Sequence, residues 1–252
     1  MDKNGIIEAY SRATERLLLL DYDGVLAPIM PLPEQAAPSE KTYELLKELA
    51  ADQHNTCVVI SGRPRETLEQ WLGDLPLAFA AEHGLWRREH RSAWEFARSV
   101  STDWKQAIKE VMQHYERTLK GSFIEEKYAG LALHYRNVAA KDASDTIRLL
   151  LRDLEPFAAQ LRLTVLNGKK VVEVIPDGVD KGEAAKFWLS AKKWDFILGA
   201  GDDETDEALF KQLPATAYSI KVGKGITQAK ERIESQSEFM LLLGAFAEDR
   251  DR

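Results

Sequence analysis

Short apolar runs that each end in a polar turn are the main feature of the sequence. Residues 17–20 are all leucine and lead directly into a polar turn at 21–24, and similar runs occupy residues 56–60, 78–81 and 196–200. Runs this short, with no polar side chain on either face, are typical of strands buried on both sides in a parallel sheet. We therefore expect four such strands, each followed by a polar turn.

The segments between these runs carry helix signals. Ser39 is a suitable N-cap, because its side-chain oxygen can accept a backbone N–H of the first helical turn. Strands alternating with helices predict a doubly wound parallel sheet, that is, a Rossmann-like α/β core. The expected helices of this core cover residues 5–16, 39–51, 65–73 and 181–190, and a closing strand is expected over 216–222.

The middle of the chain follows a different pattern. A long amphipathic helix is expected over 103–120, and residues 123–135 and 161–175 alternate in polarity like half-exposed strands, with a helix over 141–156 between them. This order is typical of an α+β unit with an antiparallel sheet. We therefore predict an inserted α+β cap domain at 102–178, which divides the core domain into a first part, 1–101, and a second part, 179–252.

Composition and charge narrow the class of protein. The 252 residues are 44% hydrophobic and 30% charged, which excludes a disordered or fibrous chain. The net charge of -7 argues against binding to nucleic acid or to a membrane surface. The leucine run at 17–20 is too short for a signal peptide or a membrane span. A single cysteine, Cys57, allows no intramolecular disulfide. These features lead us to expect a cytoplasmic protein.

Polar and charged side chains follow each buried run where the strand ends. In a parallel sheet these ends meet at one edge, where ligands bind. The aspartates among them would crowd together, and like-charge repulsion opposes such a cluster unless a cation is present. Oxygen ligands without cysteine favour Mg²⁺. Lys181, at the start of a helix, would add positive charge for a phosphate. The residues after the four runs are Asp21 and Asp23, Ser61 and Arg63, Glu82 and His83, and Asp202 and Asp203.

These segments resemble the four motifs of the haloacid-dehalogenase-like phosphatase superfamily. Taken singly, each has a plain structural explanation: a turn, a strand-to-helix link, a surface lysine, or a solvated pair of N-cap residues. Their occurrence in this order, each placed just after a buried run or at a helix start, favours a joint catalytic role. The matching segments are Asp21-Tyr22-Asp23-Gly24, Ser61-Gly62-Arg63, Lys181, and GDDETDE at residues 201–207.

Within that superfamily the sequence is similar to the trehalose-6-phosphate phosphatase family. The similarity covers roughly residues 17–230 and includes both the core and the insert. It implies a hydrolase that converts trehalose 6-phosphate to trehalose and phosphate, with a cap of the C2 type. The segments that carry it, besides GDDETDE, are Glu82-His83-Gly84, Glu125-Glu126-Lys127, His134-Tyr135-Arg136, and GKKVVE at residues 168–173.

The resemblance also implies roles for individual residues. Asp21 would be the nucleophile of a two-step phosphoryl transfer through an aspartyl-phosphate, and Asp23 would be the general acid and base. Mg²⁺ would be held by Asp21, Asp23, Asp202 and Asp203. The phosphate would be bound by Ser61, Gly62 and Lys181. The substrate would be bound by Arg63, Glu82, His83, Gly84, Glu125, Lys127, Arg136, Lys169 and Glu173.

One departure and two alternatives follow from this comparison. The family usually has threonine where this chain has Val25, so a hydroxyl near the phosphate is missing and a slower reaction is expected.

The substrate could be another sugar phosphate, because the cap selects the substrate in this superfamily. The chain could also be a weakly active regulatory domain of a trehalose-synthesising partner, although its intact Asp21 and Lys181 argue against that. We expect a monomer that could be functionally coupled to a trehalose-6-phosphate synthase.

Overall fold

The structure, a computed structural model, describes residues 1–248 and divides into two compact units. One unit comprises Met1–Ala97 together with the chain from Asp180 onward, and the other comprises Arg98–Val179. The second unit contains the whole of the segment for which the sequence predicts an insert, residues 102–178. The first unit is called the core and the second the cap below.

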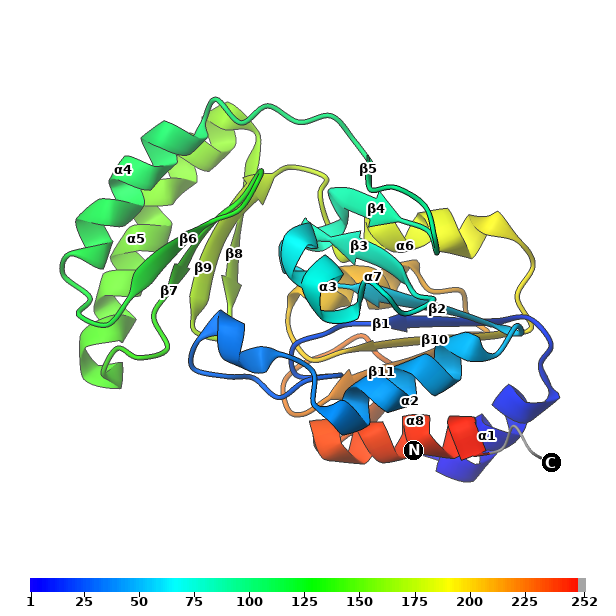
Figure 1. Cartoon of the computed structure of the whole chain (residues 1–252). Coiled ribbons are helices and arrows are strands. Elements are labelled where there is room, and N and C mark those ends of the chain that lie inside the picture. Colours follow the sequence, from blue (N-terminus) through cyan, green and yellow to red (C-terminus); the bar gives the residue numbers. More distant parts are fainter. Residues whose placement is uncertain (249–252) are drawn as a thin grey trace. The chain divides into compact units, whose positions relative to one another are not determined.

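Within the described residues, the core is built on an eight-stranded sheet in the order β12-β11-β10-β1-β2-β3-β4-β5 (Figure 1). The strands from β12 to β3 in this order are parallel to one another. β4 pairs antiparallel with β3, and β5 pairs antiparallel with β4. The strands are β1 (Arg16–Leu20), β2 (Asn55–Ile60), β3 (Ala78–Ala81), β4 (Trp86–Arg88), β5 (Glu95–Phe96), β10 (Phe196–Gly201), β11 (Tyr218–Val222) and β12 (Glu231–Ile233).

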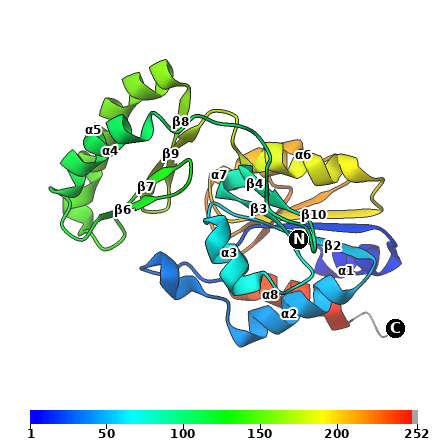
Figure 2. The same ribbon diagram turned by 45° about the horizontal axis from the view of Figure 1, so that its top comes forward.

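Helices cover both faces of this sheet (Figures 1 and 2). Leu17 and Leu19 of β1 pack in one cluster with Trp188 of α6 and Phe210 of α7. The helices α1, α2 and α8 lie on the other face, where Tyr10 of α1 stacks on Phe246 of α8. The helices are α1 (Lys3–Arg12), α2 (Glu40–Ala51), α3 (Arg65–Leu72), α6 (Lys181–Ala191), α7 (Thr205–Gln212) and α8 (Gln236–Glu248), with short 3₁₀ turns η1 (Pro33–Ala36) and η2 (Glu82–Gly84).

This arrangement confirms the doubly wound α/β core. The four leucines of β1 are all 0% exposed, as expected for a strand buried on both faces. Ser39 caps α2 by accepting a hydrogen bond from the backbone N–H of Thr42. The sheet therefore forms where the short apolar runs predict it.

The cap is an antiparallel sheet with two helices on one face (Figure 1). Leu131 and Leu133 of the sheet pack against Ile108 and Leu150 of the helices, and this face forms a separate apolar cluster. The sheet order is β6-β7-β9-β8. The elements are α4 (Lys105–Glu116), β6 (Phe123–Glu126), β7 (Leu131–His134), α5 (Ala140–Leu161), β8 (Leu163–Gly168) and β9 (Val171–Pro176).

The structure differs from the sequence-based expectation at several elements. The helix expected over 5–16 ends at Arg12, and Arg16 already begins β1. The predicted closing strand is not the last one, because β12 pairs parallel with β11 at the sheet edge. The strands β4 and β5 were not predicted, since they are only three and two residues long. The helix expected to end near residue 156 continues through Pro156 to Leu161, and Phe157 and Ala158 pack against the cap cluster. Tertiary packing there outweighs the backbone hydrogen bond that proline removes.

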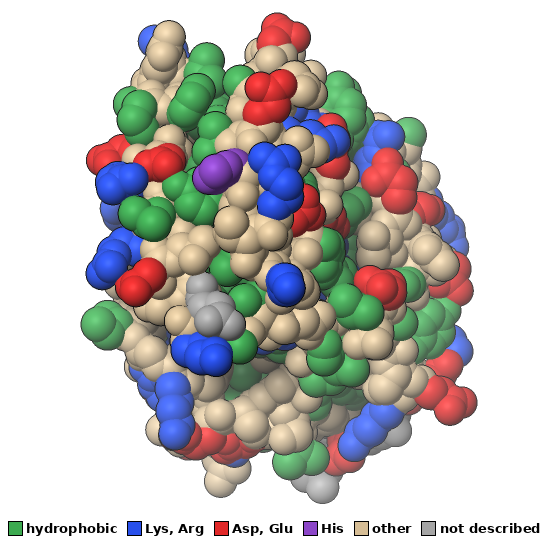
Figure 3. Space-filling view, turned by 90° about the vertical axis from the view of Figure 1, so that its left-hand side faces the viewer, with side chains coloured by type: hydrophobic (Ala, Val, Ile, Leu, Met, Phe, Trp, Pro, Cys, Tyr) green, Lys and Arg blue, Asp and Glu red, His purple; other side chains and the backbone are tan. Residues whose placement is uncertain are grey.

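Three features of the described residues bear on the class of protein: the helices, the surface charges and the cysteine. No helix of the described part of the chain is long and apolar enough to cross a membrane. Acidic and basic side chains lie interspersed on the face shown in Figure 3. Cys57 is buried in β2, and its burial raises the pKa of the thiol to about 12.

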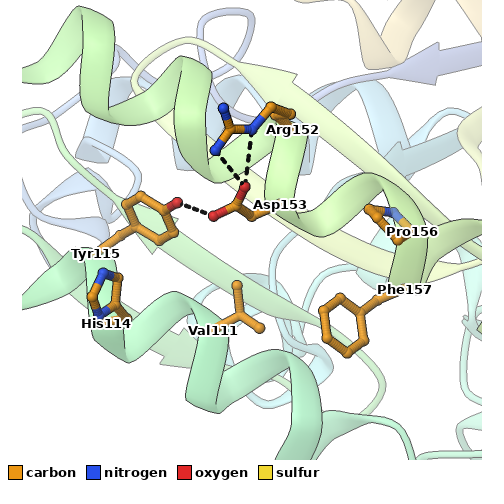
Figure 4. A pocket seen from close by; sticks show the side chains of 7 residues that line it. All are labelled: Val111, His114, Tyr115, Arg152, Asp153, Pro156 and Phe157. Carbon is orange, nitrogen blue, oxygen red and sulfur yellow. Dashed lines mark hydrogen bonds and ion pairs between the residues drawn. The ribbon is translucent and has the colours of Figure 1, made fainter.

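A hollow of about 590 Å³ lies on the cap between α4 and α5 (Figure 4). In it the Tyr115 hydroxyl donates a hydrogen bond to Asp153, which also accepts from Arg152. None of the residues expected to bind substrate lines this hollow. Its remaining lining residues are Val111, His114, Pro156 and Phe157.

Candidate active site

The carboxyl ends of β1 and β10 bring Asp21 and Asp202 together. Leu20 pairs with Ala200 in the parallel register, so both strands end at the same level of the sheet edge. Gly24 follows in a left-handed conformation with φ of 80°, and a Cβ atom there would lie only 2.1 Å from Oδ2 of Asp202. The turn after β1 therefore needs glycine both for its backbone conformation and for the close approach of a carboxylate.

Lys181 joins two of the buried carboxylates. Its ammonium lies 2.7 Å from Oδ1 of Asp21 and 2.8 Å from Oδ1 of Asp206, and its side chain is only 3% exposed. Lys181 is the first residue of α6, where Asp180 caps the helix by accepting from the Glu183 N–H. The helix start thus fixes a cation at the strand ends.

Asp206 is a site residue to which the sequence analysis gave no role. It is wholly buried, and its Oδ2 accepts hydrogen bonds from the backbone N–H groups of Asp202 at 2.8 Å and Asp203 at 2.9 Å. Its Oδ1 faces Lys181. Asp206 therefore anchors both the loop after β10 and the lysine. Its position four residues after Asp202, in the first turn of a helix, was the available signal.

The electrostatics of this cluster raise the pKa of Asp21 even though the Lys181 ammonium lies beside it. The pKa of Asp21 is raised well above its ordinary value, chiefly because burial disfavours its charged form and next because Asp206 repels it. Lys181 opposes this shift but does not cancel it. The pKa of Lys181 is raised, since the charges of Asp206 and Asp21 outweigh the effect of burial, the largest single influence. The lysine therefore stays charged.

The same cluster has the donor set that a divalent cation needs. Asp21, Asp202 and Asp206 are all buried, and one carboxylate oxygen from each lies within 4.8 Å of the others. Three carboxylates facing one ammonium leave an excess of negative charge, and oxygen-only ligands suit Mg²⁺. Because Asp206 already serves Lys181 and two backbone N–H groups, Asp21 and Asp202 are the side chains better suited to hold the ion.

Asp23 lies in a bidentate ion pair with Arg63. The guanidinium Nε and Nη2 lie 2.7 Å and 2.6 Å from the two oxygens of Asp23. Arg63 also donates to the carbonyl of Pro33 and stacks over Trp71, with 4.6 Å between the guanidinium carbon and the ring centroid. Asp23 is thereby held in one orientation, with 37% of its side chain still exposed. Substrate contact by Arg63 stays a prediction.

Ser61, which is buried, and Gly62 form the turn after β2. Ser61 is 1% exposed, and its hydroxyl accepts a hydrogen bond from the backbone N–H of Arg63 at 3.2 Å. The strand pairs β1–β2 and β1–β10 place this turn and Asp21 at the same edge of the sheet. Phosphate binding by Ser61, Gly62 and Lys181 stays a prediction that this arrangement supports.

Val25 and Asp203 occupy positions beside the cluster. The Val25 side chain is 0% exposed, and its backbone N–H, which would be a candidate donor to a phosphate oxygen, donates a long 3.4 Å hydrogen bond to the carbonyl of Tyr22. Asp203 accepts from the Glu204 N–H. Lys221, which the sequence analysis did not single out, is 3% exposed and donates to the Asp203 carbonyl at 3.0 Å. This lysine supports the loop after β10 from the neighbouring strand.

Two of the predicted sugar-binding residues of the cap, Glu125 and Glu173, lie on the sheet face opposite the helices. Glu125 and Glu173 both pair in register with Ala132, so their side chains share one face. Lys127 lies 2.6 Å from Glu173, both being under 10% exposed, and His134 lies 2.7 Å from Glu125. Burial opposes ionisation of Glu125, but the hydrogen bond from His134 and the charge of Lys127 lower its pKa overall.

Arg136 and Lys169 lie near the β8–β9 turn of the cap. The Arg136 guanidinium donates to the backbone carbonyl of Lys169. The turn also contains Lys170 in a left-handed conformation with φ of 70°. The five predicted cap residues thus belong to one sheet and its turns, and their contact with a sugar stays a prediction.

The fold is shared with solved structures of other proteins. The structure resembles that of a haloacid dehalogenase-like hydrolase from Bacteroides thetaiotaomicron, with a TM-score of 0.66 over 92% of this chain and 98% of that chain, at 13% identity, which is a likeness of fold alone. The C-terminal domain of Candida albicans trehalose-6-phosphate phosphatase is more similar, with a TM-score of 0.94, 28% identity, and coverage of 98% of this chain and 97% of that one.

The sequence comparisons give the family. The trehalose-phosphatase family model matches residues 19–241, and the chain belongs to that family. A bifunctional trehalose-6-phosphate synthase/phosphatase of Thermoproteus tenax is 44% identical over 224 residues, which is 89% of this chain. The chain spans only 31% of the length of that relative.

Proposed function

We propose that the chain is an Mg²⁺-dependent phosphatase that hydrolyses trehalose 6-phosphate to trehalose and phosphate through an aspartyl-phosphate on Asp21. The observation that carries this proposal is the buried cluster at the strand ends, where Lys181 lies within 2.8 Å of both Asp21 and Asp206 in a chain of the trehalose-phosphatase family. The cluster offers a carboxylate that can act as the nucleophile, an ammonium that can bind phosphate, and two further carboxylates. These are groups that phosphoryl transfer can use.

In the first step an oxygen of Asp21 attacks phosphorus and the bond from phosphorus to the sugar oxygen breaks. Asp23 gives its proton to the departing oxygen, so trehalose leaves as a neutral alcohol. Lys181 and the turn at Ser61 and Gly62 bind the phosphoryl oxygens and stabilise the charge that develops on them.

In the second step a water molecule attacks the phosphorus of the aspartyl-phosphate. Asp23, now ionised, takes the proton of that water, and the bond from phosphorus to Asp21 breaks to release phosphate. Arg63 orients the Asp23 carboxylate through both of its oxygens, so one of these two contacts must open before that oxygen can carry the proton of the first step.

Mg²⁺, when bound, would supply positive charge beside the nucleophile and the phosphoryl oxygens. The side chains of Asp21 and Asp202, the backbone carbonyl of Asp23, and Asp203 would hold it. The excess negative charge of the cluster supports this assignment.

The cap would select the sugar. A disaccharide with many hydroxyls needs charged and carbonyl groups as partners, and the cap offers them at Glu125, Lys127, Arg136, Lys169 and Glu173.

The relative from Thermoproteus tenax carries synthase and phosphatase in one chain. Functional coupling of this chain to a trehalose-6-phosphate synthase is therefore part of the proposal, as is its action as a monomer.

The test is phosphate release from trehalose 6-phosphate, measured with Mg²⁺, with excess EDTA, and with the Asp21→Asn variant. We expect release only with Mg²⁺ and the wild-type chain. A variant rate above about one hundredth of wild type, equivalent to ~2.7 kcal/mol of barrier, would mean that Asp21 is not the nucleophile. A panel of other sugar phosphates in the same assay tests whether trehalose 6-phosphate is the preferred substrate.

A further inference from the structure

Three consecutive residues after β3 adopt left-handed backbone conformations. The φ angles are 47° at Glu82, 58° at His83 and 104° at Gly84. Such angles are uncommon for residues other than glycine, and they persist only where the surrounding structure enforces them. Glu82 and His83 are also only 5% exposed. The turn is therefore a strained and buried segment next to the proposed phosphate-binding groups.

The backbone of this turn holds the loop that carries Ser61. The N–H of Glu82 donates to the Arg63 carbonyl at 3.0 Å, and the N–H of His83 donates to the Ser61 carbonyl at 2.9 Å. Two successive N–H groups of one turn thus tie down the residues on either side of Gly62. This use of both N–H groups accounts for the left-handed angles.

The His83 ring completes the contact with the same loop. A Cβ atom on Gly62 would lie 2.6 Å from Cε1 and 2.7 Å from Nε2 of His83, which is closer than real atoms approach. The far edge of the imidazole therefore packs against the Cα of Gly62. A methyl group at position 62 would therefore require the His83 ring to move.

The other end of the turn contacts the helix that begins with Lys181. A Cβ atom on Gly84 would lie 2.4 Å from the Cβ of Ala184, three residues into α6. The turn thus lies between the Ser61 loop and the start of α6. These two elements supply the groups that we assign to the transferring phosphoryl group.

We propose that the turn Glu82–Gly84 sets the spacing between the Ser61 loop and Lys181, and that His83 is a positioning residue that acts through Gly62. This inference rests on the proposed function for the identity of the reaction. It assigns to the turn a role other than the direct substrate contact that the sequence resemblance implies. Fixed donors gain their effect in phosphoryl transfer from being held in place before the reaction begins.

The test uses a pair of substitutions whose effects should compensate. His83→Asn removes Cε1 and Nε2, the atoms against Gly62, and asparagine tolerates a left-handed backbone. Gly62→Ala introduces the excluded methyl group. We expect Gly62→Ala to lower kcat for trehalose 6-phosphate about 100-fold, and the double variant to recover at least about tenfold of that loss because the methyl group then fits. Arg91→Asn, exposed and also left-handed with φ of 61°, is the matched control and should match wild type.

His83→Asn alone should lower kcat about tenfold and leave KM nearly unchanged. A rise in KM for trehalose 6-phosphate at constant kcat would instead indicate direct sugar contact and overturn the inference. The inference would also be overturned if Gly62→Ala were fully active, or if kcat of the double variant were no higher than that of Gly62→Ala. If Gly62→Ala does not fold, the His83→Asn result decides. If the wild type does not hydrolyse trehalose 6-phosphate, the proposed function fails, and the same variants are judged by phosphate binding and by hydrolysis of p-nitrophenyl phosphate.

Discussion

Asp206 shows how much one buried carboxylate contributes to this site. It accepts hydrogen bonds from the Lys181 ammonium and from two backbone N–H groups of the loop after β10. Each of its oxygens therefore accepts at least one hydrogen bond. The amide oxygen of an asparagine here could accept the hydrogen bonds that one carboxylate oxygen now accepts. Its NH₂ group would then face the donors that the other oxygen now binds.

We expect Asp206→Asn to lower kcat by about 100-fold or more and to destabilise the core by about 3 kcal/mol, because a buried ion pair loses one partner. Phosphate release and the melting temperature measure the two effects. Asp2→Asn is the control, since asparagine caps a helix as well as aspartate does and Asp2 caps α1 at an exposed position. A normal rate and melting temperature for Asp206→Asn would contradict the anchoring role.

At the scale of elements, the cap sheet carries two pairs of ionisable side chains on the face opposite its helices. The pairs are Glu125 with His134 and Lys127 with Glu173, and strand register brings both glutamates onto one face. Buried charges of this kind destabilise a fold unless each has a partner. The cap is therefore sensitive to protonation of its glutamates.

The lowered pKa of Glu125 fixes the sign of this sensitivity. Its ionisation stabilises the fold above the unfolded-state pKa of about 4.3, and that stability is lost as the pH falls through the lower pKa of the folded state. Glu125→Gln should therefore melt at a lower temperature than wild type at pH 6–7, with a loss of about 1.5 kcal/mol in the free energy of unfolding. The two proteins should converge in stability as the pH falls below the folded-state pKa of Glu125. A difference that stays constant with pH would rule out this ion pair as its cause.

The β8–β9 turn offers a test of sugar recognition that leaves the fold intact. Arg136 binds the backbone carbonyl of Lys169, so truncation of the lysine side chain keeps that hydrogen bond. We expect Lys169→Ala to reduce kcat/KM for trehalose 6-phosphate about ten- to a hundred-fold, the effect of one charge-assisted hydrogen bond. Hydrolysis of p-nitrophenyl phosphate should not change, and neither substrate should be affected by Lys120→Ala at an exposed position. Equal losses on both substrates would point away from sugar recognition.

At the scale of the molecule, the charge of the core site links metal binding to stability. Removal of Mg²⁺ with EDTA should lower the melting temperature as well as stop phosphate release, because the buried carboxylates then repel one another. Saturating Mg²⁺ should raise the melting temperature of the metal-free protein by about 5 °C or more. Asp202→Asn should reduce this response. A melting temperature that does not respond to Mg²⁺ would argue against a metal site at these carboxylates.

The sequence was sufficient to predict the sheet but not its margins. The strands β1, β2, β3 and β10 are apolar on both faces, a signal that is local and strong. The edge strands β5 and β12, and β4 next to β5, are two or three residues long, and their pairing depends on tertiary contacts that no short window contains. The order of motifs likewise indicated which charged groups lie at the site, because strand ends meet at one edge.

Pairings within the site were less accessible from sequence. The ion pair of Asp23 with Arg63 joins residues 40 positions apart, and either residue alone fits a substrate-binding role equally well. The contact of His83 with Gly62 depends on left-handed angles at two residues other than glycine, which residue type does not predict. Position along the chain identifies the groups of such a site, whereas their partners depend on side-chain geometry.

The burial of Cys57 makes the chain a suitable host for site-specific labels. As the sole cysteine, with its thiol inside β2 and a pKa of about 12, it should not react with maleimide dyes or spin labels while the protein is folded. Cysteines introduced at the exposed positions Lys47 in the core and Arg148 in the cap would then be the reactive thiols. A pair of labels there would report the distance between the two units, and its change on addition of a sugar phosphate, without removal of the native cysteine.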